Sequence, residues 1–396
     1  MNKNWDVIVI GGGIIGLACA YYLTQDGKKV LLLEKGDIGE GASTSCDDMI
    51  FLQSKKPGIL LTIAMESLDM YRKLAKDLPV DIEFENRGGM VLIESTSQLG
   101  HMENFVRQQK ALGLDVELLD RHEVRKFCPL ASPHILASTY SPIDSQVNPL
   151  HVMRGFVKIA SAQGLEMKQH TPVTGLSSPS PGHWQVTTGD GTVYETEYVV
   201  NAAGAWAPQL AAMTGIDLPI KPKRGQIAVT EAVPPFGKTN FWSADYIVMK
   251  LNPEFAKERD SLLNDLGIGL SMSQSHSGTY FLGGTREFAG FDKSVDRVAL
   301  RLILKEAARF FPTLEKVNII RTFAGFRPAP GDGKPYIGPV VSQPGLYIAA
   351  GHEGDGIALA PITGYAISRM IAGKKLPFDL SELAPEGRVQ MWSTID

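Results

Sequence analysis

Buried strands and an apolar helix alternate at the start of the chain. Val7 to Ile10 is a short apolar run that predicts a buried strand, and glycines follow it directly. An apolar helix then extends to about Gln25, and Lys29 to Leu33 predicts a second buried strand. Near the other end, Leu346 to Ala350 predicts a strand and Gly356 to Ile371 a helix. Strands that alternate with helices in this way favour an α/β fold.

The middle of the chain has a different pattern, in which strands follow one another. Phe84 to Glu94 predicts a hairpin, and Gln98 to Leu112 and Val295 to Phe310 predict helices. The segments "RGQIAVTEA", "YIVMK" and "GLSMSQSHSGTYFLGGT" predict strands, so we expect a largely antiparallel sheet with helices behind it. A chain of 396 residues exceeds what one hydrophobic core serves. We therefore expect two domains: a discontinuous one of residues 1–80, 145–218 and 323–396, and a second of residues 81–144 and 219–322.

A glycine pattern joins the first strand to the first helix. Gly11, Gly13 and Gly16 form the motif G-x-G-x-x-G, and Glu34 closes the second strand 18 residues after Gly16. This arrangement is typical of a dinucleotide-binding unit. Gly11 allows a tight turn, Gly13 lets the backbone approach a pyrophosphate at the helix N-terminus, and Gly16 lets helix and strand pack closely. Glu34 can accept hydrogen bonds from an adenosine ribose, which disfavours NADP and leaves FAD and NAD open.

Later segments favour FAD over NAD. "GASTS", from Gly41 to Ser45, is small and polar and suits phosphate or ribityl oxygens, although an ordinary serine loop has the same composition. "YVVNAAGAWA", from Tyr198 to Ala207, predicts a strand, a small-residue turn that a cofactor can approach, and a helix start. The glycine loop from Gly351 to Gly356 precedes a helix whose N–H groups can face a negatively charged ring. A reduced flavin is such a ring, and a nicotinamide is not.

Composition narrows the range of cofactors and partners. A net charge of -4 gives no reason to expect nucleic acid. The three cysteines, Cys19, Cys46 and Cys128, are far apart and form no C-x-x-C pair. This excludes a disulfide framework, argues against a metal site in this chain and fits a reducing cytoplasm. Val7 to Leu23 resembles a signal peptide or a short membrane span, but Asp6 precedes it and four glycines interrupt it, so we expect no transmembrane segment.

Six motifs are spread over nearly the whole chain. They are Gly11-x-Gly13-x-x-Gly16 with Glu34, "GAS" from Gly41, "NAAGAWA" from Asn201, "FLGGTREFAGFD" from Phe281, "FAGFRPAPGDGKPYIG" from Phe323 and "GHEGDGIALAPITG" from Gly351. Together they resemble the FAD-dependent D-amino-acid oxidase superfamily, in the branch with glycine oxidase, sarcosine oxidase and the catalytic subunits of proline, hydroxyproline and opine dehydrogenases. The resemblance implies an α/β fold in which the discontinuous domain is Rossmann-like and binds FAD. It implies a second, α+β domain that binds substrate and is built on the largely antiparallel sheet.

Arg327 stands between an apolar run and a Pro/Gly-rich turn. By the resemblance, the arginine of this segment binds the substrate carboxylate, and a planar guanidinium matches a carboxylate with two parallel hydrogen bonds. A structural arginine that pairs with Asp332 or a carbonyl remains the alternative. The resemblance also implies little acid–base machinery: a neutral amine gives a hydride to flavin N5, and the imine is hydrolysed. Some relatives attach flavin through a cysteine near this segment, and this chain has none beyond Cys128, so we expect non-covalent FAD.

The resemblance assigns further residues to the two halves of the site. Tyr246, on a predicted strand, is the expected catalytic residue beside Arg327, although cores use the same residue types. The expected substrate pocket contains Met49, Met249, Met272, His276, His352 and Glu353. The expected FAD-binding residues are Gly11, Gly13, Ile14, Ile15, Gly16, Glu34, Lys35, Gly41, Ala42, Ser43, Thr44, Val173, Ala202, Ala203, Gly204, Trp206, Gly325, Arg327, Gly351, His352, Glu353, Gly354, Asp355, Gly356 and Ile357.

The segment after Gly41 departs from the family pattern. Relatives often carry a small, Asn/Gly-rich run there, whereas this chain has "STSCDDMIFLQSKKPG". Asp47 and Asp48 are placed to contact a basic substrate group or a partner, or they only flank the cofactor. The ending Lys56 to Gly58 is similar to catalytic subunits of hydrogen cyanide synthase and of hydroxyproline and opine dehydrogenases. We therefore expect companion redox subunits with flavin or iron–sulfur centres, in the cytoplasm, with any membrane association through those partners.

The expected function is FAD-dependent oxidation of a small amino or imino acid of the proline, hydroxyproline, glycine, sarcosine or opine type. Three alternatives remain: a 2-hydroxyacid or glycerol-phosphate dehydrogenase on the same scaffold, an oxidase that uses O₂ directly, and a non-catalytic subunit. The charged segment of residues 252–266 is an insertion that serves as a lid or as a contact surface.

Overall fold

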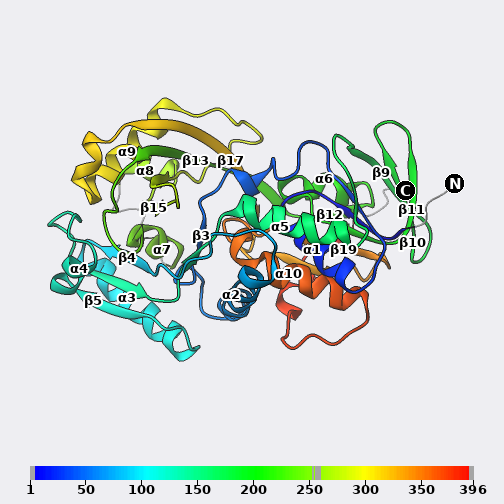
Figure 1. Ribbon diagram of the computed structural model, residues 1–396, viewed down its shortest axis with the longest axis horizontal. Helices are drawn as coiled ribbons and strands as arrows, with labels where there is room; N and C mark the ends of the chain where they lie inside the picture. Colours follow the sequence, from blue (N-terminus) through cyan, green and yellow to red (C-terminus); the bar gives the residue numbers. More distant parts are fainter. Residues whose placement is uncertain (1–4, 252–253, 255–259, 392–396) are drawn as a thin grey trace.

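The computed structural model describes residues 5–251, 254 and 260–391. Two eight-stranded sheets lie side by side along the long axis of the molecule, with β9 and β10 at one end and α3, α4 and β5 at the other (Figure 1). The expected α/β class and the largely antiparallel character of the second sheet are confirmed.

The first sheet has the order β18-β19-β11-β1-β2-β8, and its central strands β19, β11, β1 and β2 are parallel. The antiparallel strands β9 and β10 extend from β11. The strands are β1 (Trp5–Ile10), β2 (Val30–Leu33), β8 (Glu166–Lys168), β9 (Val173–Ser180), β10 (His183–Thr188), β11 (Val193–Asn201), β18 (Tyr336–Pro339) and β19 (Leu346–Ala350).

Alternate residues of the central strands pack on opposite faces of this sheet. Val7 and Val9 of β1 belong to the core under four helices, whereas Ile8 and Ile10 belong to the core under α6 and β9–β10. Because both faces are covered, the strand sequence is apolar throughout. The helices are α1 (Ile14–Gln25), α2 (Ile59–Asp77), α5 (Pro149–Ala162) and α10 (Gly356–Ile371) on the first face and α6 (Ala207–Ala212) on the second.

The second sheet has the order β17-β13-β16-β15-β14-β4-β6-β5 and is antiparallel except for the β14–β4 pair. Helix α9 covers one face, and α3 and α7 cover the other. The strands are β4 (Gly89–Ile93), β5 (Glu117–Asp120), β6 (Ala137–Ser141), β13 (Ile220–Ala232), β14 (Asn240–Ser243), β15 (Ser271–Gln274), β16 (Thr279–Gly283) and β17 (Ile319–Pro330). The helices are α3 (Thr96–Ala111), α4 (Arg121–Phe127), α7 (Ala244–Leu251), α8 (Ser261–Asp265) and α9 (Arg297–Phe310).

Short elements complete the fold. Two small sheets pair β3 (Met49–Ile50) with β7 (Ser145–Gln146) and β12 (Ile216–Asp217) with β20 (Gln390–Met391). The 3₁₀ turns are η1 (Ala42–Thr44), η2 (Gly204–Trp206), η4 (Pro312–Lys316) and η5 (Ser381–Leu383). Strand β17 pairs with β13 along nearly its whole length, so the proposed domain boundary at residues 322–323 falls inside one strand. The division into two domains stays a proposal.

Two sequence predictions about the second sheet are wrong. The "YIVMK" segment is not a strand but helix α7, because Ala244, Ile247 and Val248 lie at helical spacing and pack into the core beside α3. Phe84 to Glu94 is not a hairpin: only β4 forms within it, and β4 pairs with β6 and β14. The predicted lid or contact surface of residues 252–266 lies partly outside the described residues, which include 254 and 260–266 with helix α8.

Candidate functional site

A cavity of about 390 Å³ lies between the carboxyl ends of the parallel strands and the β13–β17 pair. Its wall combines segments that are distant in the sequence, from the first glycine turn to the loop before α10. Most of the predicted cofactor residues lie on this wall. They are Gly11, Gly13, Ile14, Ile15, Glu34, Lys35, Gly41, Ala42, Ser43, Val173, Ala202, Ala203, Gly204, Trp206, Gly325, Arg327, His352, Glu353, Gly354, Gly356 and Ile357.

At one end, the turn before α1 leaves no room for side chains. Gly11 has φ +114°, and a Cβ there would lie 2.5 Å from the Ala202 carbonyl oxygen. The backbone N–H of Ile14 donates to Ser43 Oγ at 3.0 Å, which fixes the "GAS" turn beside the helix N-terminus. The Glu34 carboxylate accepts hydrogen bonds from the backbone N–H groups of Gly12 at 2.6 Å and Gly36 at 2.9 Å. This end therefore presents backbone donors and one carboxylate, the groups that a dinucleotide uses.

At the other end, Arg327 extends from β17 into the cavity. Its Nη1 donates to the Thr285 carbonyl oxygen at 2.9 Å, and its guanidinium lies over Gly225, where a Cβ would be 2.6 Å from Cζ. Among the described residues, no carboxylate forms an ion pair with Arg327. Asp332, the structural partner considered above, instead pairs with Arg388 at 2.9 Å. Burial and the positive charge of Arg286 lower the pKa of Arg327, and the nearby carboxyl groups of Glu353 and Asp47 oppose this shift only in part.

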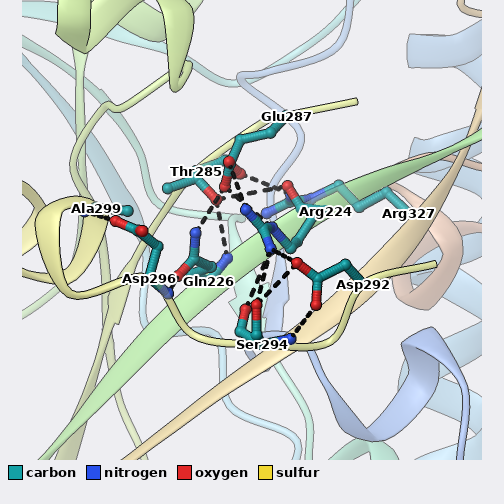
Figure 2. A network of polar contacts seen from close by, with 9 residues as sticks. All are labelled: Arg224, Gln226, Thr285, Glu287, Asp292, Ser294, Asp296, Ala299 and Arg327. Atoms are coloured by element: carbon teal, nitrogen blue, oxygen red, sulfur yellow. Dashed lines mark hydrogen bonds and ion pairs between the residues drawn. The ribbon is translucent and has the colours of Figure 1, made fainter. Parts of the chain in front are cut away.

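A network around Arg224 holds the loop that contacts Arg327. Arg224 donates to Glu287 through Nε and Nη2, at 3.3 and 2.8 Å, and to Asp292 through Nη1 at 2.6 Å. Gln226 donates to Glu287 at 2.6 Å and accepts from the backbone N–H of Asp296 at 2.7 Å. Figure 2 shows these groups gathered around the Arg224 guanidinium, with Arg327 beside them. The network fixes residues 284–296 on β13, and with them the Thr285 carbonyl that orients Arg327.

The loop between β19 and α10 brings two predicted residues to the cavity in different charge states. His352 is buried, with its Nε2 3.0 Å from Thr363 Oγ1, and burial lowers its pKa to about 4, against partial opposition from Asp355. Glu353 has φ 49° and forms an ion pair with Lys223 at 3.2 Å. Burial raises the pKa of Glu353, but Lys223, Arg327 and Arg286 outweigh it and hold the pKa at about 2. At neutral pH the ring is therefore uncharged and the carboxylate ionised.

The neutral state of His352 predicts a pH dependence of stability. Its pKa in the folded protein, about 4, is below the ordinary value of 6.5, so the unfolded chain binds this proton more tightly. The resulting stability is present above pH 6.5 and is lost as the pH falls toward 4, by up to about 3 kcal/mol. We expect His352→Gln to flatten this decline in urea unfolding measured at saturating FAD. The exposed His276→Gln is the matched control, and parallel curves for wild type and His352→Gln would contradict the assignment.

Several predicted residues do not line this cavity. Met49 and Met272 are buried in the cores of the second sheet, and His276 is on the turn after β15, 3.6 Å from Glu85, with 68% of its side chain exposed. His276 instead borders a separate cavity of about 230 Å³. Tyr246 lies on α7 under Arg286, whose Cζ is 3.7 Å from the ring centroid. The Met249 side chain lies outside the described residues.

Four predicted cofactor residues support the cavity without lining it: Gly16, Thr44, Gly351 and Asp355. At Gly16 a Cβ would collide with the Gly11 carbonyl, so its role is the close packing of helix and strand. Asp355 forms an ion pair with the buried Lys55 at 2.7 Å.

Sequence reasoning missed three cations near or on the wall: Lys223, Arg286 and Lys293. Lys223 is on β13, and the others are on the loop that Arg224 holds. The only available signal was that Arg286 and Lys293 lie in or beside "FLGGTREFAGFD".

Cys46 is the cysteine that the structure places on the wall. Its Sγ donates to the Ser43 carbonyl oxygen at 3.4 Å. Burial, together with the negative charges of Asp47 and Asp48, raises the pKa of this thiol far above its usual range. A thiol that stays protonated is a poor nucleophile, which agrees with non-covalent cofactor binding.

Comparisons with known proteins agree with this site. Residues 6–370 match the family described as FAD dependent oxidoreductase. The chain is 31% identical to a glycine oxidase of Bacillus licheniformis, over 94% of both chains, and 28% identical to hydrogen cyanide synthase subunit HcnC of Pseudomonas aeruginosa, over 96% of this chain and 95% of that one. The crystal structure of glycine oxidase from Geobacillus kaustophilus superposes with a TM-score of 0.86 at 25% identity, over 96% of this chain and 98% of the other.

The chain therefore belongs to the FAD-dependent oxidoreductase family, and the resemblance to the D-amino-acid oxidase superfamily is confirmed. FAD is its cofactor. The residues present fit FAD, because the glycine turn, the α1 N-terminus and Glu34 supply what its adenosine diphosphate half requires. Within the described part of the chain, none of the helices has the combined length and apolar character that a membrane span requires.

Proposed function

We propose that this protein oxidises a small amino or imino acid of the glycine, sarcosine, proline, hydroxyproline or opine type. Arg327 carries the proposal, because a guanidinium inside a cavity without an ion-pair partner among the described residues is costly unless a ligand supplies the anion. A substrate carboxylate meets this need with two parallel hydrogen bonds. The names of the relatives, glycine oxidase and a hydrogen cyanide synthase subunit, support an amino acid as the substrate.

In this proposal the chain acts mainly by positioning. Arg327, held by Thr285 and by the loop on Arg224, fixes the carboxylate and therefore the adjacent carbon. FAD, when bound, accepts the hydrogen and two electrons from that carbon. His352, uncharged and hydrogen-bonded to Thr363, holds the loop at the start of α10 without adding positive charge to the cavity.

We also propose that the electrons pass to a companion redox subunit in the cytoplasm, rather than chiefly to oxygen. The similarity to HcnC, which is named as a subunit, supports this partner. Rapid oxygen consumption by the isolated chain with its substrate would contradict it.

The experiment that tests the reaction is an anaerobic titration of the FAD-bound protein. Glycine, sarcosine, both enantiomers of proline and hydroxyproline, opines, and 2-hydroxyacids with glycerol phosphate are added in turn, and flavin absorbance is followed. We expect one amine class to bleach the flavin. Bleaching only by hydroxyacids or glycerol phosphate would replace the proposal with the alternative on the same scaffold, and no bleaching by any compound would support a non-catalytic subunit.

A further inference from the structure

Asp47 places a carboxyl group on the wall of the same cavity. It lies three residues after η1 and two residues before the short strand β3, and the nearby Ser45 packs against Gly325 of β17. Its Oδ2 accepts a hydrogen bond from Ser271 Oγ at 3.1 Å. Among the described residues, no cation forms an ion pair with Asp47, whose hydrogen-bond donors are the Ser271 hydroxyl and the backbone of Met49.

Asp47 and Arg327 thus place on the cavity wall a carboxyl group and a guanidinium that do not form an ion pair with each other. They are close enough to interact: Arg327 and Arg286 oppose the rise that burial causes in the pKa of Asp47. A protein that needed only to neutralise Arg327 would close this pair into a salt bridge. Two opposite charges held apart in one cavity match the carboxylate and ammonium groups of an α-amino acid.

We propose that Asp47 binds the ammonium group of the substrate and accepts one of its protons, while Arg327 holds the carboxylate. The inference rests on the proposed function, whose substrate it defines as a zwitterionic amino acid. The N–H bond breaks, its electron pair stays on nitrogen, and the proton moves to a carboxylate oxygen of Asp47. The neutral amine then loses a hydrogen and two electrons from its carbon to FAD, which leaves an iminium ion that water hydrolyses.

Two ligands of similar shape separate ammonium binding from carboxylate binding. 2-Aminoisobutyrate is an amino acid without a hydrogen on the α-carbon, so it cannot be oxidised, and isobutyrate is the same acid without the amino group. Both are titrated into the FAD-bound protein by calorimetry. We expect wild type to prefer 2-aminoisobutyrate, and Asp47→Asn to bind it at least roughly 10-fold more weakly while isobutyrate affinity changes by less than about 3-fold.

Asp48→Asn is the matched control, because Asp48 is the adjacent buried carboxyl and is absent from the cavity wall. It should leave both affinities unchanged. If Asp47→Asn changed the affinities for both ligands equally, the proposal would be overturned. Asp47 would then only balance the positive charge of the arginines. The proposal would also be overturned if wild type bound 2-aminoisobutyrate no more tightly than isobutyrate, or if Asp47→Asn kept the preference for 2-aminoisobutyrate.

A pH profile tests the proton transfer. The groups that face Asp47 are Arg327, Arg286, Asp48 and Cys46, and burial sets the pKa of Asp47 above its ordinary range. With an amine that bleaches the flavin, the reduction rate of wild type should fall as the pH is lowered through that pKa. Ser271→Ala removes a hydrogen bond that favours the ionised carboxylate, so the fall in rate at low pH should begin at a higher pH in this variant. Asp47→Asn should abolish the fall. If the rate falls at the same pH in wild type and in Ser271→Ala, the proton transfer to Asp47 is contradicted. If no amine reduces the flavin, the proposed function itself is refuted.

Discussion

Arg327→Met is expected to abolish most amine oxidation without lowering the stability of the protein. Methionine retains the unbranched apolar part of the side chain but removes the guanidinium over Gly225 that the substrate carboxylate would meet. Truncating one partner of a buried charge pair costs about 2–5 kcal/mol, so kcat/KM should fall roughly 30- to 5,000-fold. In the free protein, however, the same change removes a cation that burial and Arg286 disfavour, and that Glu353 and Asp47 stabilise only in part. Thermal unfolding should therefore occur at an unchanged or higher temperature.

This combination distinguishes a binding residue from a structural one. Arg321→Met, an exposed arginine on the same strand β17, is the matched control and should leave both activity and stability near wild type. Arg327→Met also removes the hydrogen bond to the Thr285 carbonyl, and if Arg327 is mainly structural this loss should outweigh the relief of the charge and lower the unfolding temperature. If Arg327→Met unfolds earlier and retains substrate affinity, Arg327 does not bind the carboxylate.

The elements of the first sheet could be predicted because each is encoded locally. The helix predicted from Gly356 to Ile371 is α10 itself, since a glycine loop precedes it and Gly373 follows its last turn. The strand predicted from Leu346 is β19, a continuous apolar run that is buried on both faces. Local signals of this kind need no knowledge of what the segment packs against.

The failures in the second sheet have the opposite cause. Ile247 and Val248 are β-branched, so their local preference is for a strand, and only packing beside α3 makes the segment a helix. The predicted hairpin around Gly89 required a partner next to it in sequence. Its real partners, β6 and β14, are far along the chain, and local sequence does not specify such pairings.

The candidate site shows the same division. The glycine turn and Glu34 follow from one motif, and Arg327 from another. Arg286 and Lys223 could not be found in this way, because they approach Arg327 only through the pairing of β13 with β17 and the loop that Arg224 holds. His276 is in a segment with strand character, but the turn that carries it faces away from the cavity wall.

Lys55→Met is expected to cause a large loss of stability together with weaker FAD binding. Only 2% of the Lys55 side chain is exposed, and its Nζ donates to Asp355 at 2.7 Å, to the Phe51 carbonyl at 2.7 Å and to Ser54 at 3.0 Å. Removing the cation leaves Asp355 without its partner at the start of α10. Breaking a buried pair costs about 3–5 kcal/mol. Because Asp355 adjoins Gly354 and Gly356 on the cavity wall, we expect FAD affinity to fall with stability.

Urea unfolding and FAD titration of three variants test this. Lys56→Met, the exposed neighbour, should match wild type, and Lys55→Met with Asp355→Asn should recover part of the loss, because the second change removes the orphaned charge. If the double variant is no more stable than Lys55→Met, the cost comes from the Phe51 and Ser54 hydrogen bonds alone. In that case the ion pair between Lys55 and Asp355 does not hold the loop at the start of α10. If recovery does occur, a segment that departs from the family pattern in sequence also supports the loop at the start of α10.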